Sequence, residues 1–166
     1  MANLIYMNEE AQLIWADSGG TYALTFKGLA TGTGRQGATH NWGVNARAIW
    51  CTWRLMVHFD TATVPVVDEI VRIHAKTSDG TNWDNDDGEG DIALSDEDKL
   101  KNCKQIGSVV VDEAAADVPM SSGGIIRLPA TEFAPIIFNA TADTLDDDAS
   151  PTDSRFILTP FAMEVQ

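Results

Sequence analysis

Long apolar runs are missing from this 166-residue chain. A membrane-spanning helix needs about 18 predominantly apolar residues, and no stretch of the sequence approaches that length. The opening residues, MANLIYMNEE, also lack the basic region and apolar core of a secretory signal. We therefore expect a protein that binds no membrane and is not exported by the usual signal.

Cysteine and histidine are scarce. Cys51 and Cys103 are far apart and form no C-x-x-C pair, which argues against a disulfide framework or zinc site and predicts two reduced, mostly buried thiols. The three histidines, His40, His58 and His74, are predicted to be ordinary residues, with His58 and His74 facing solvent from strands. Because the chain also has no G-x-S-x-G, H-E-x-x-H or Walker sequence, a small jelly-roll enzyme is the least favoured function.

Basic residues are outnumbered. Eleven Lys and Arg stand against 25 Asp and Glu, for a net charge of −14, and a field of that sign argues against nucleic acid as a partner. Residues 1–58 hold only three of the acids. Nine acids with no base lie from Asp79 to Asp98, and five more lie from Asp143 to Asp153. Both stretches are rich in small polar residues and are predicted to be exposed loops.

A glycine motif lacks the context that would give it a function. Residues 32–37 read GTGRQG and satisfy the dinucleotide-binding pattern G-x-G-x-x-G. That pattern needs a helix that opens at the glycines, and the following ATHNWGVN has no helical apolar period. We expect a flexible loop here.

Alternation of apolar and polar residues is the dominant pattern. Residues 49–59 place Ile49, Cys51, Trp53, Leu55, Val57 and Phe59 on one side, as in a half-buried strand. Residues 69–76 alternate in the same way after the turn-like TATVP, which predicts an antiparallel hairpin. Six shorter runs, 12–16, 22–26, 106–111, 125–128, 135–138 and 156–159, lie between turn sequences. Together they predict about eight short strands.

These strands, with little helix, predict an all-β fold, namely a jelly-roll-like antiparallel β-sandwich with one short helix opened by Ser95. Residues 131–133 are a second candidate for a helical turn. The length suits a single domain, 11–166, preceded by an N-terminal arm, 1–10. Because Leu4, Ile5 and Tyr6 of the arm are poorly placed in water, we expect them to cover a neighbouring surface.

The acidic run offers the hard oxygen ligands that calcium prefers, with Asp84, Asp86, Asp87 and Asp91 as candidate ligands. An EF-hand register that starts at Asn82 fails, because Asp87 stands where the glycine belongs and Ala93 where the bidentate glutamate belongs. A calcium loop of another kind and a solvated acidic loop both stay open.

Five tryptophans are many for this length. Trp53 has the inward parity, whereas Trp50 has the outward parity and Trp42 and Trp83 fall in predicted loops. Those three are candidates for an interface or a ligand surface. Since jelly-roll sugar-binding modules use exposed aromatic residues as stacking platforms, a carbohydrate-binding module on a virion or cell surface is the alternative function.

The order of segments along the chain resembles that of the head decoration, or cement, proteins of tailed bacteriophages. The segments that carry the resemblance are AQLIWADSGGTYALTFKGLATGTGR, WRLMVHFDTATVPVVDEIVRIHAKTSDGTNWD, LKNCKQIGSVVVDE, FAPIIFNATADTL and RFILTPFAMEVQ. The resemblance implies a structural protein without catalytic residues or an obligatory cofactor. Many copies, commonly homo-trimers, would bind the major capsid protein on the outer surface of the virion, after assembly in the host bacterial cytoplasm.

The distribution of charge suggests which surface attaches. Turning acidic loops against another protein would bury unpaired carboxylates at several kcal/mol each, so we expect those loops to face solvent or a bound cation. Attachment would then use the acid-poor N-terminal third. Besides the three apolar residues of the arm, Arg35 and Arg47 are the candidate contact residues there.

Overall fold

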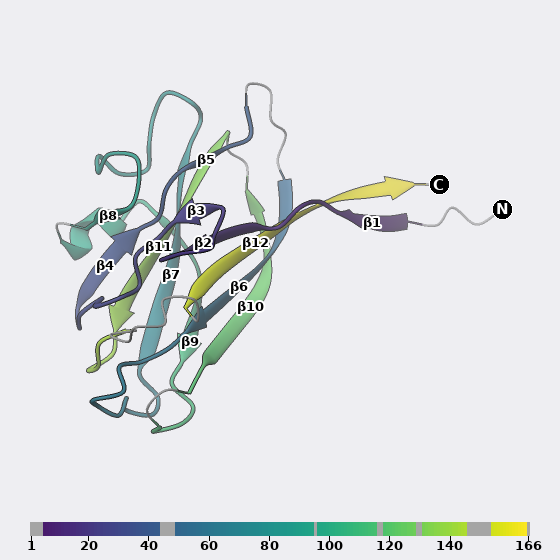
Figure 1. Cartoon of the computed structure of the whole chain (residues 1–166). Coiled ribbons are helices and arrows are strands. Elements are labelled where there is room, and N and C mark those ends of the chain that lie inside the picture. The colour runs from purple at the N-terminus through teal and green to yellow at the C-terminus, as the bar shows by residue number, and fades with distance from the viewer. Residues whose placement is uncertain are drawn as a thin grey trace.

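The computed structural model describes residues 5–43, 49–94, 96–115, 118–128, 131–145 and 154–165. Within these ranges the chain has twelve strands, one 3-10 turn and no α-helix (Figure 1). The strands form two six-stranded sheets that pack face to face. The all-β sandwich predicted from the alternation is therefore confirmed.

One sheet, called the β6 sheet here, contains the arm strand and the C-terminal strand. Its order is β10 (Met120–Leu128), β6 (Ile49–Val57), β12 (Arg155–Val165), β2 (Leu13–Ala16) and β3 (Tyr22–Ala23), with β1 (Ile5–Glu9) paired to β12. The other, the β7 sheet, has the order β8 (Ile92–Ala93), β4 (Thr33–Gln36), β11 (Glu132–Ala140), β7 (Ile70–Ser78) and β9 (Lys104–Val110), with β5 (His40–Asn41) paired to β11.

The long strands pair in a nested order. β2 pairs with β12, β4 with β11, β6 with β10 and β7 with β9, each pair antiparallel. A long antiparallel ribbon of this kind, rolled so that β12 meets β6 and β11 meets β7, gives the jelly-roll-like arrangement. All eight predicted strands are present, and β1, β4, β5 and β8 are additional.

The predicted hairpin of residues 49–59 and 69–76 is wrong. β6 pairs with β10 and β12, whereas β7 pairs with β9 and β11, so the connection between them crosses from one sheet to the other. Backbone hydrogen bonds from Asp60 to Thr144 and from Asp68 to Val111 hold this crossing. Alternation shows that each strand has one buried face, but it does not specify the partner strand.

Three smaller predictions also need correction. The GTGRQG loop is largely strand β4, and the described residues 37–43 that follow it form no helix, as expected. Residues 131–133 lead into β11 rather than forming a helical turn. The predicted helix is the 3-10 turn η1 (Glu97–Leu100), which begins after Asp96 without a side-chain cap, and Ser95 lies outside the described residues.

The main core fills the space between the sheets, and alternation placed its β6 residues correctly. Cys51, Leu55 and Val57 are fully buried and Trp53 is nearly so. The Trp53 ring lies against two glycines. A Cβ at Gly107 of β9 would come within 2.4 Å of the ring, and one at Gly124 of β10 within 3.0 Å. Only residues without a side chain fit at this close approach.

A second, smaller core lies on the outer face of the β7 sheet. It contains Leu100, Cys103, Ile136 and Phe138, with Leu94 packed against them. The residues that cover this face come from the segment 79–103. Its first part, residues 79–98, carries the nine acids and is called the acidic segment below. Figure 1 shows β8 and η1 on this side of the sandwich, away from β6 and β10.

Candidate attachment surfaces

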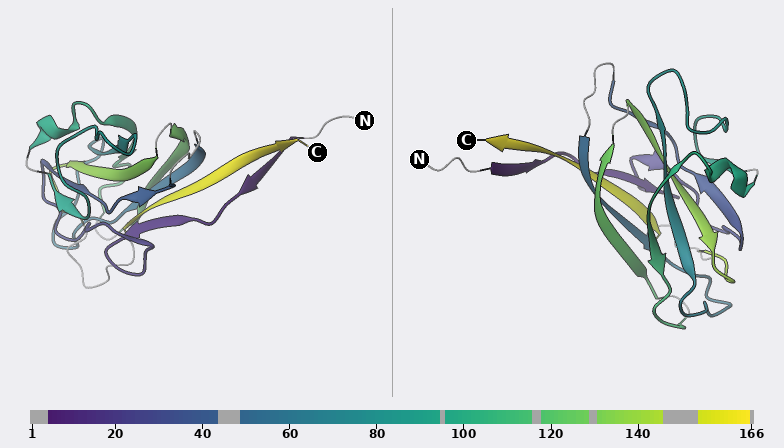
Figure 2. Two further views of the ribbon diagram at one scale, coloured as in Figure 1. Left: turned by 90° about the horizontal axis from the view of Figure 1, so that it is seen from above. Right: turned by 180° about the vertical axis from the view of Figure 1, so that it is seen from behind.

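The N- and C-terminal strands form a two-stranded ribbon that leaves the sandwich. β1 pairs with β12 from Ile5 opposite Val165 to Glu9 opposite Phe161. Pairing of β12 with β6 ends at Phe161, opposite Trp50. Beyond that point β1 is the partner of β12 within the described part of the chain, and both views in Figure 2 show the ribbon projecting from the body.

Two of the three arm residues predicted from the sequence to contact a neighbouring surface belong to the ribbon. Ile5 and Tyr6 lie in β1, at the outer end of the ribbon, and Leu4 lies outside the described residues. A ribbon of two strands is marginally stable in water on its own, and its outer edges offer unpaired backbone groups to a third strand. Such a ribbon is suited to contact with another chain.

Arg35 and Asp91, to which the sequence assigned separate roles, are partners. The Arg35 Nε lies 2.6 Å from Asp91 Oδ1, and Nη2 donates to the Asp91 carbonyl over 3.3 Å. Thr25 donates to the same carboxylate from its amide and its hydroxyl. Burial alone would raise the pKa of Asp91, but the hydrogen bonds from Arg35 and Thr25 hold it below 3.8. The pair ties the acidic segment to β4. Arg47 lies outside the described residues.

The other three candidate calcium ligands also hold the acidic segment in place. Asp84 accepts hydrogen bonds from the Thr77 amide and hydroxyl, at 2.6 and 2.8 Å. Asp86 forms an ion pair with Lys99, and Asp87 lies 3.9 Å from the same ammonium group. Among the described residues, no group of three or more His, Cys, Asp or Glu is arranged to hold a metal ion.

Lys76 is the buried centre of these contacts. Its side chain is fully buried and its Nζ donates to Gln36 Oε1 and to the Gly88 carbonyl, both at 3.0 Å, and to the Asp87 carbonyl. The ammonium also lies 4.7 Å from the centre of the Trp83 ring. The acidic segment is therefore closed over a cation that the alternation pattern had placed on the solvent side.

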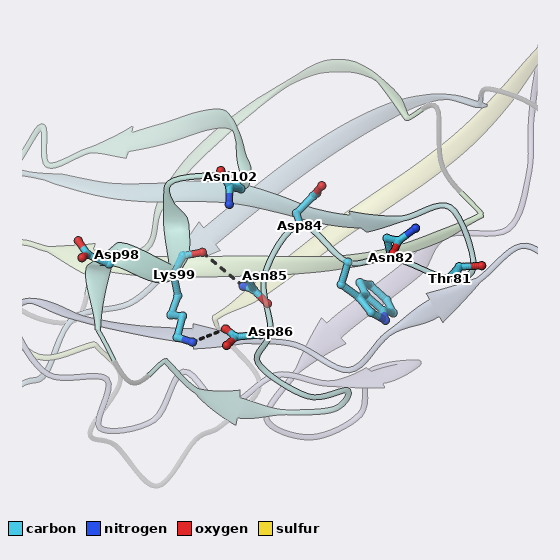
Figure 3. A pocket seen from close by; sticks show the side chains of 9 residues that line it. Thr81, Asn82, Asp84, Asn85, Asp86, Asp98, Lys99 and Asn102 are labelled. Carbon is cyan, nitrogen blue, oxygen red and sulfur yellow. Dashed lines mark hydrogen bonds and ion pairs between the residues drawn. The ribbon is translucent and has the colours of Figure 1, made fainter.

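An open pocket of about 550 Å³ lies within the acidic segment. Its walls are acidic and amide side chains together with Trp83. Figure 3 shows Lys99 and Asp86 facing each other across it, with Asn85 donating to the Lys99 carbonyl over 3.5 Å. Because the lysine already pairs with one of the carboxylates, the pocket does not present an uncompensated acidic cluster.

The outer face of the β6 sheet differs in chemistry from the rest of the molecule. Trp50 is 41% exposed and Ile125 is 63% exposed. The strand register places Trp50 beside Arg127 and Arg54 beside Ile157, and Arg155 lies beside Met56. We call this set the arginine face: Trp50, Arg54, Ile125, Arg127, Arg155 and Ile157. Sequence analysis identified Trp50 as outward-facing but missed its neighbours, because their register depends on which strands pair.

A second exposed apolar group lies on the crossing between β6 and β7. Val64, Val66 and Val67 are exposed there, in the segment whose TATVP sequence predicted only a turn. Apolar residues exposed side by side along a loop are typical of contact surfaces, so this loop is a third candidate.

The two cysteines, His40 and His74 are each buried or engaged by a neighbour. Burial raises the pKa of Cys51 to about 12 and that of Cys103 to about 11, so both buried thiols, free as expected, are poor nucleophiles. His40 Nδ1 lies 2.6 Å from the Tyr22 hydroxyl. His74, expected to face solvent, is buried beside η1, and burial lowers its pKa.

Comparison of the sequence with known families and curated proteins gives no relative. No protein-family model matches the chain, and no curated protein sequence is significantly similar to it. Among the described residues, no helix is long and apolar enough to cross a membrane.

Proposed function

We propose that this protein is a non-enzymatic decoration protein that binds in many copies to the major capsid protein on the outside of a bacteriophage head. The β1–β12 ribbon is the observation that carries the proposal. A compact sandwich with a projecting ribbon suits a protein that sits on a surface and reaches an adjacent subunit. The order of sequence segments that resembles head decoration proteins supports the same function.

Many weak contacts are sufficient for such a protein. When copies bind a repeating shell, each ribbon needs only modest affinity, because neighbouring contacts raise the local concentration of the next one. Pairing of the ribbon edge with a strand of the shell would add backbone hydrogen bonds without a deep pocket. The proposal thus requires neither a metal nor a cofactor.

The test uses expanded heads that lack the protein. Full-length protein and the variant Ile5→Asp with Met7→Asp are mixed with these heads, and the bound fraction is measured by co-sedimentation. Placing two charges on one side of β1 should weaken binding at least about tenfold, which corresponds to about 1.4 kcal/mol. Glu9→Gln is the matched control within β1. Equal binding of the double variant and the parent would contradict a role for the ribbon in attachment.

A carbohydrate-binding module is the second candidate, favoured by the exposed Trp50 ring. An exposed tryptophan beside Arg127 on an open sheet could stack on a sugar ring and donate hydrogen bonds to its substituents. A glycan array separates the two functions. Specific binding that Trp50→Ala abolishes supports a sugar-binding module, whereas a decoration protein should bind no glycan.

A further inference from the structure

The arginine face carries basic and apolar residues but no acid, in a chain whose net charge is −14. Three of the six arginines of the chain lie on it, on three adjacent strands. Along β2, β6, β10 and the part of β12 that pairs with β6, no outward-facing position is Asp or Glu. Acidic residues make up 25 of the 166 positions, so their absence from these strand segments gives this part of the sheet face a charge opposite to that of the molecule. Glu9 of β1, which lies opposite Phe161, is an acid at the edge of the face.

The arginines of this face have no acidic partner in their own copy among the described residues. The arginine ion pairs there are those of Arg35 with Asp91 and Arg72 with Glu97, both on the β7 side. Arg54 donates to the Ser121 hydroxyl over 3.4 Å, a weak contact between two residues of the same face. The guanidinium groups can therefore accept carboxylates from outside.

The acidic segment supplies carboxylates of the required kind. The side chains of Asp86, Glu97 and Asp98 are 83%, 58% and 74% exposed, although each also forms an ion pair in its own copy, with Lys99, Arg72 and Lys101 respectively. Because solvent-exposed ion pairs are weak, a docked arginine can share or replace them. They lie on the outer side of the β7 sheet, and the sandwich separates them from the arginine face (Figure 1). One copy cannot bring the two surfaces together, but two copies can.

We infer that the arginine face of one copy docks on the acidic segment of a second copy. Trp50 and Ile125 would be covered at the centre of the contact, and Arg54 and Arg127 would pair with carboxylates around it. The two surfaces differ, so the contact is head-to-tail and either closes a ring or continues as a filament. The inference concerns contacts between copies and does not depend on attachment to a shell.

Charge complementarity favours a second copy over a polyanion. A nucleic acid or anionic glycan approaching the arginine face meets the field of the whole molecule and brings no apolar surface for Ile125. Two copies also repel at long range, but salt at physiological concentration screens that repulsion beyond about 8 Å. Short-range pairs between arginine and carboxylate survive this screening better.

The experiment exchanges the charges of the two surfaces in the full-length chain. One variant, Arg54→Glu with Arg127→Glu, reverses the arginine face, and the other, Asp86→Lys with Asp98→Lys, reverses part of the acidic segment. Sedimentation velocity follows each protein alone and the equimolar mixture from low to high micromolar concentration. Lys104→Glu, on the exposed start of β9, is the matched control, and thermal unfolding checks that every variant is folded.

We expect the parent and the control to associate as the concentration rises, and each double variant to stay monomeric. The mixture should associate again, because the acidic face of one variant meets the basic segment of the other. A parent that remains monomeric throughout, or variants that associate as the parent does, would overturn the inference. So would a reversed arginine face that loses binding to heads or to an anionic glycan while self-association is unchanged, since the occupant would then be another molecule.

Discussion

Replacement of Lys76 by Met tests whether a single buried cation fastens the acidic segment to the β7 sheet. Methionine keeps the length of the side chain and removes the ammonium group. It removes the donor to the Gln36 Oε1 atom and to the carbonyls of Asp87 and Gly88. The Gly88 carbonyl keeps a second donor, Gln36 Nε2, at 2.8 Å. Gln36 is fully buried, so water cannot easily replace the lost contact there.

The expected loss of stability follows from two opposing effects. Hydrogen bonds to a charged group contribute about 1.5–3 kcal/mol each, so the three together contribute about 4–9 kcal/mol. Burial of the ammonium costs several kcal/mol, and the variant no longer bears that cost. Burial also lowers the pKa of Lys76 below 10.5, against the opposing pull of Asp87, Glu89 and Asp84. We expect a net loss of about 2–4 kcal/mol.

Urea unfolding measures the total loss of stability in Lys76→Met, and hydrogen exchange shows which part of the protein becomes less stable. Exchange should accelerate first in the acidic segment, including the amides of Asp84 and Leu94, which donate to Thr77 and Gly34 in the parent. Amides of β6 should keep their protection. Lys104→Met, at an exposed lysine of β9, is the control. A Lys76→Met protein within about 0.5 kcal/mol of the parent, with unchanged exchange, would refute the reasoning.

Three further predictions concern the core, the acidic segment and pH. Gly107→Ala should cost about 1–3 kcal/mol in urea unfolding, because its Cβ would lie 2.4 Å from the Trp53 ring, whereas Gly88→Ala, whose Cβ would meet Ile92 at 3.5 Å, should be nearly neutral; equal effects would show that the ring can move. With a chelator present to remove calcium, Asp84→Ala should lower the free energy of unfolding by about 1–2 kcal/mol and Asp86→Ala should hardly change it, because only Asp84 accepts a hydrogen bond from a β7 amide. If calcium raises the Tm of the parent and of neither variant, that result would instead support a calcium site. Burial lowers the pKa of His74 below 6.5, so the unfolded chain binds the proton first and stability should fall as pH drops from 6.5 to 5; His74→Gln should flatten this slope by up to about 1.4 kcal/mol per pH unit, and an unchanged slope would show that His74 does not titrate differently on folding.

Alternation predicted the strands and their buried sides, since a period of two is set by the backbone of each strand alone. Val71, Ile73 and Ala75 are fully buried, and so are Cys51, Leu55 and Val57 of β6. It could not predict which strands pair, because pairing depends on how the ribbon rolls up. The wrong hairpin has this cause, whereas the short strands β5 and β8 were missed because of their length. β8 adds only two residues to the edge of β4, too few to show a period.

The candidate sites were harder to predict, because their burial depends on a segment that composition assigned to solvent. Lys76 and His74 do lie on the outer side of β7, as their parity predicts, but the segment 79–103 covers them. Asp143, predicted to lie in an exposed loop, is only 6% exposed, and its backbone amide donates a hydrogen bond to the Thr141 hydroxyl. The acids of the acidic segment are not a solvated run, because Arg35 of β4, Lys76 of β7 and Lys99 of η1 offset their charge.

The outer faces of the two sheets differ in whether the chain covers their apolar residues. An antiparallel sheet can leave one face in water if that face is polar. On the β7 sheet the outward residues Ile136 and Phe138 are not polar, and the chain covers them with its own segment. On the β6 sheet Trp50 and Ile125 are also apolar, yet they stay exposed. β12 runs from this open face, at Arg155, directly into the projecting ribbon at Phe161. The arginine face and the ribbon, the two surfaces proposed for contacts with other chains, therefore share the strand β12.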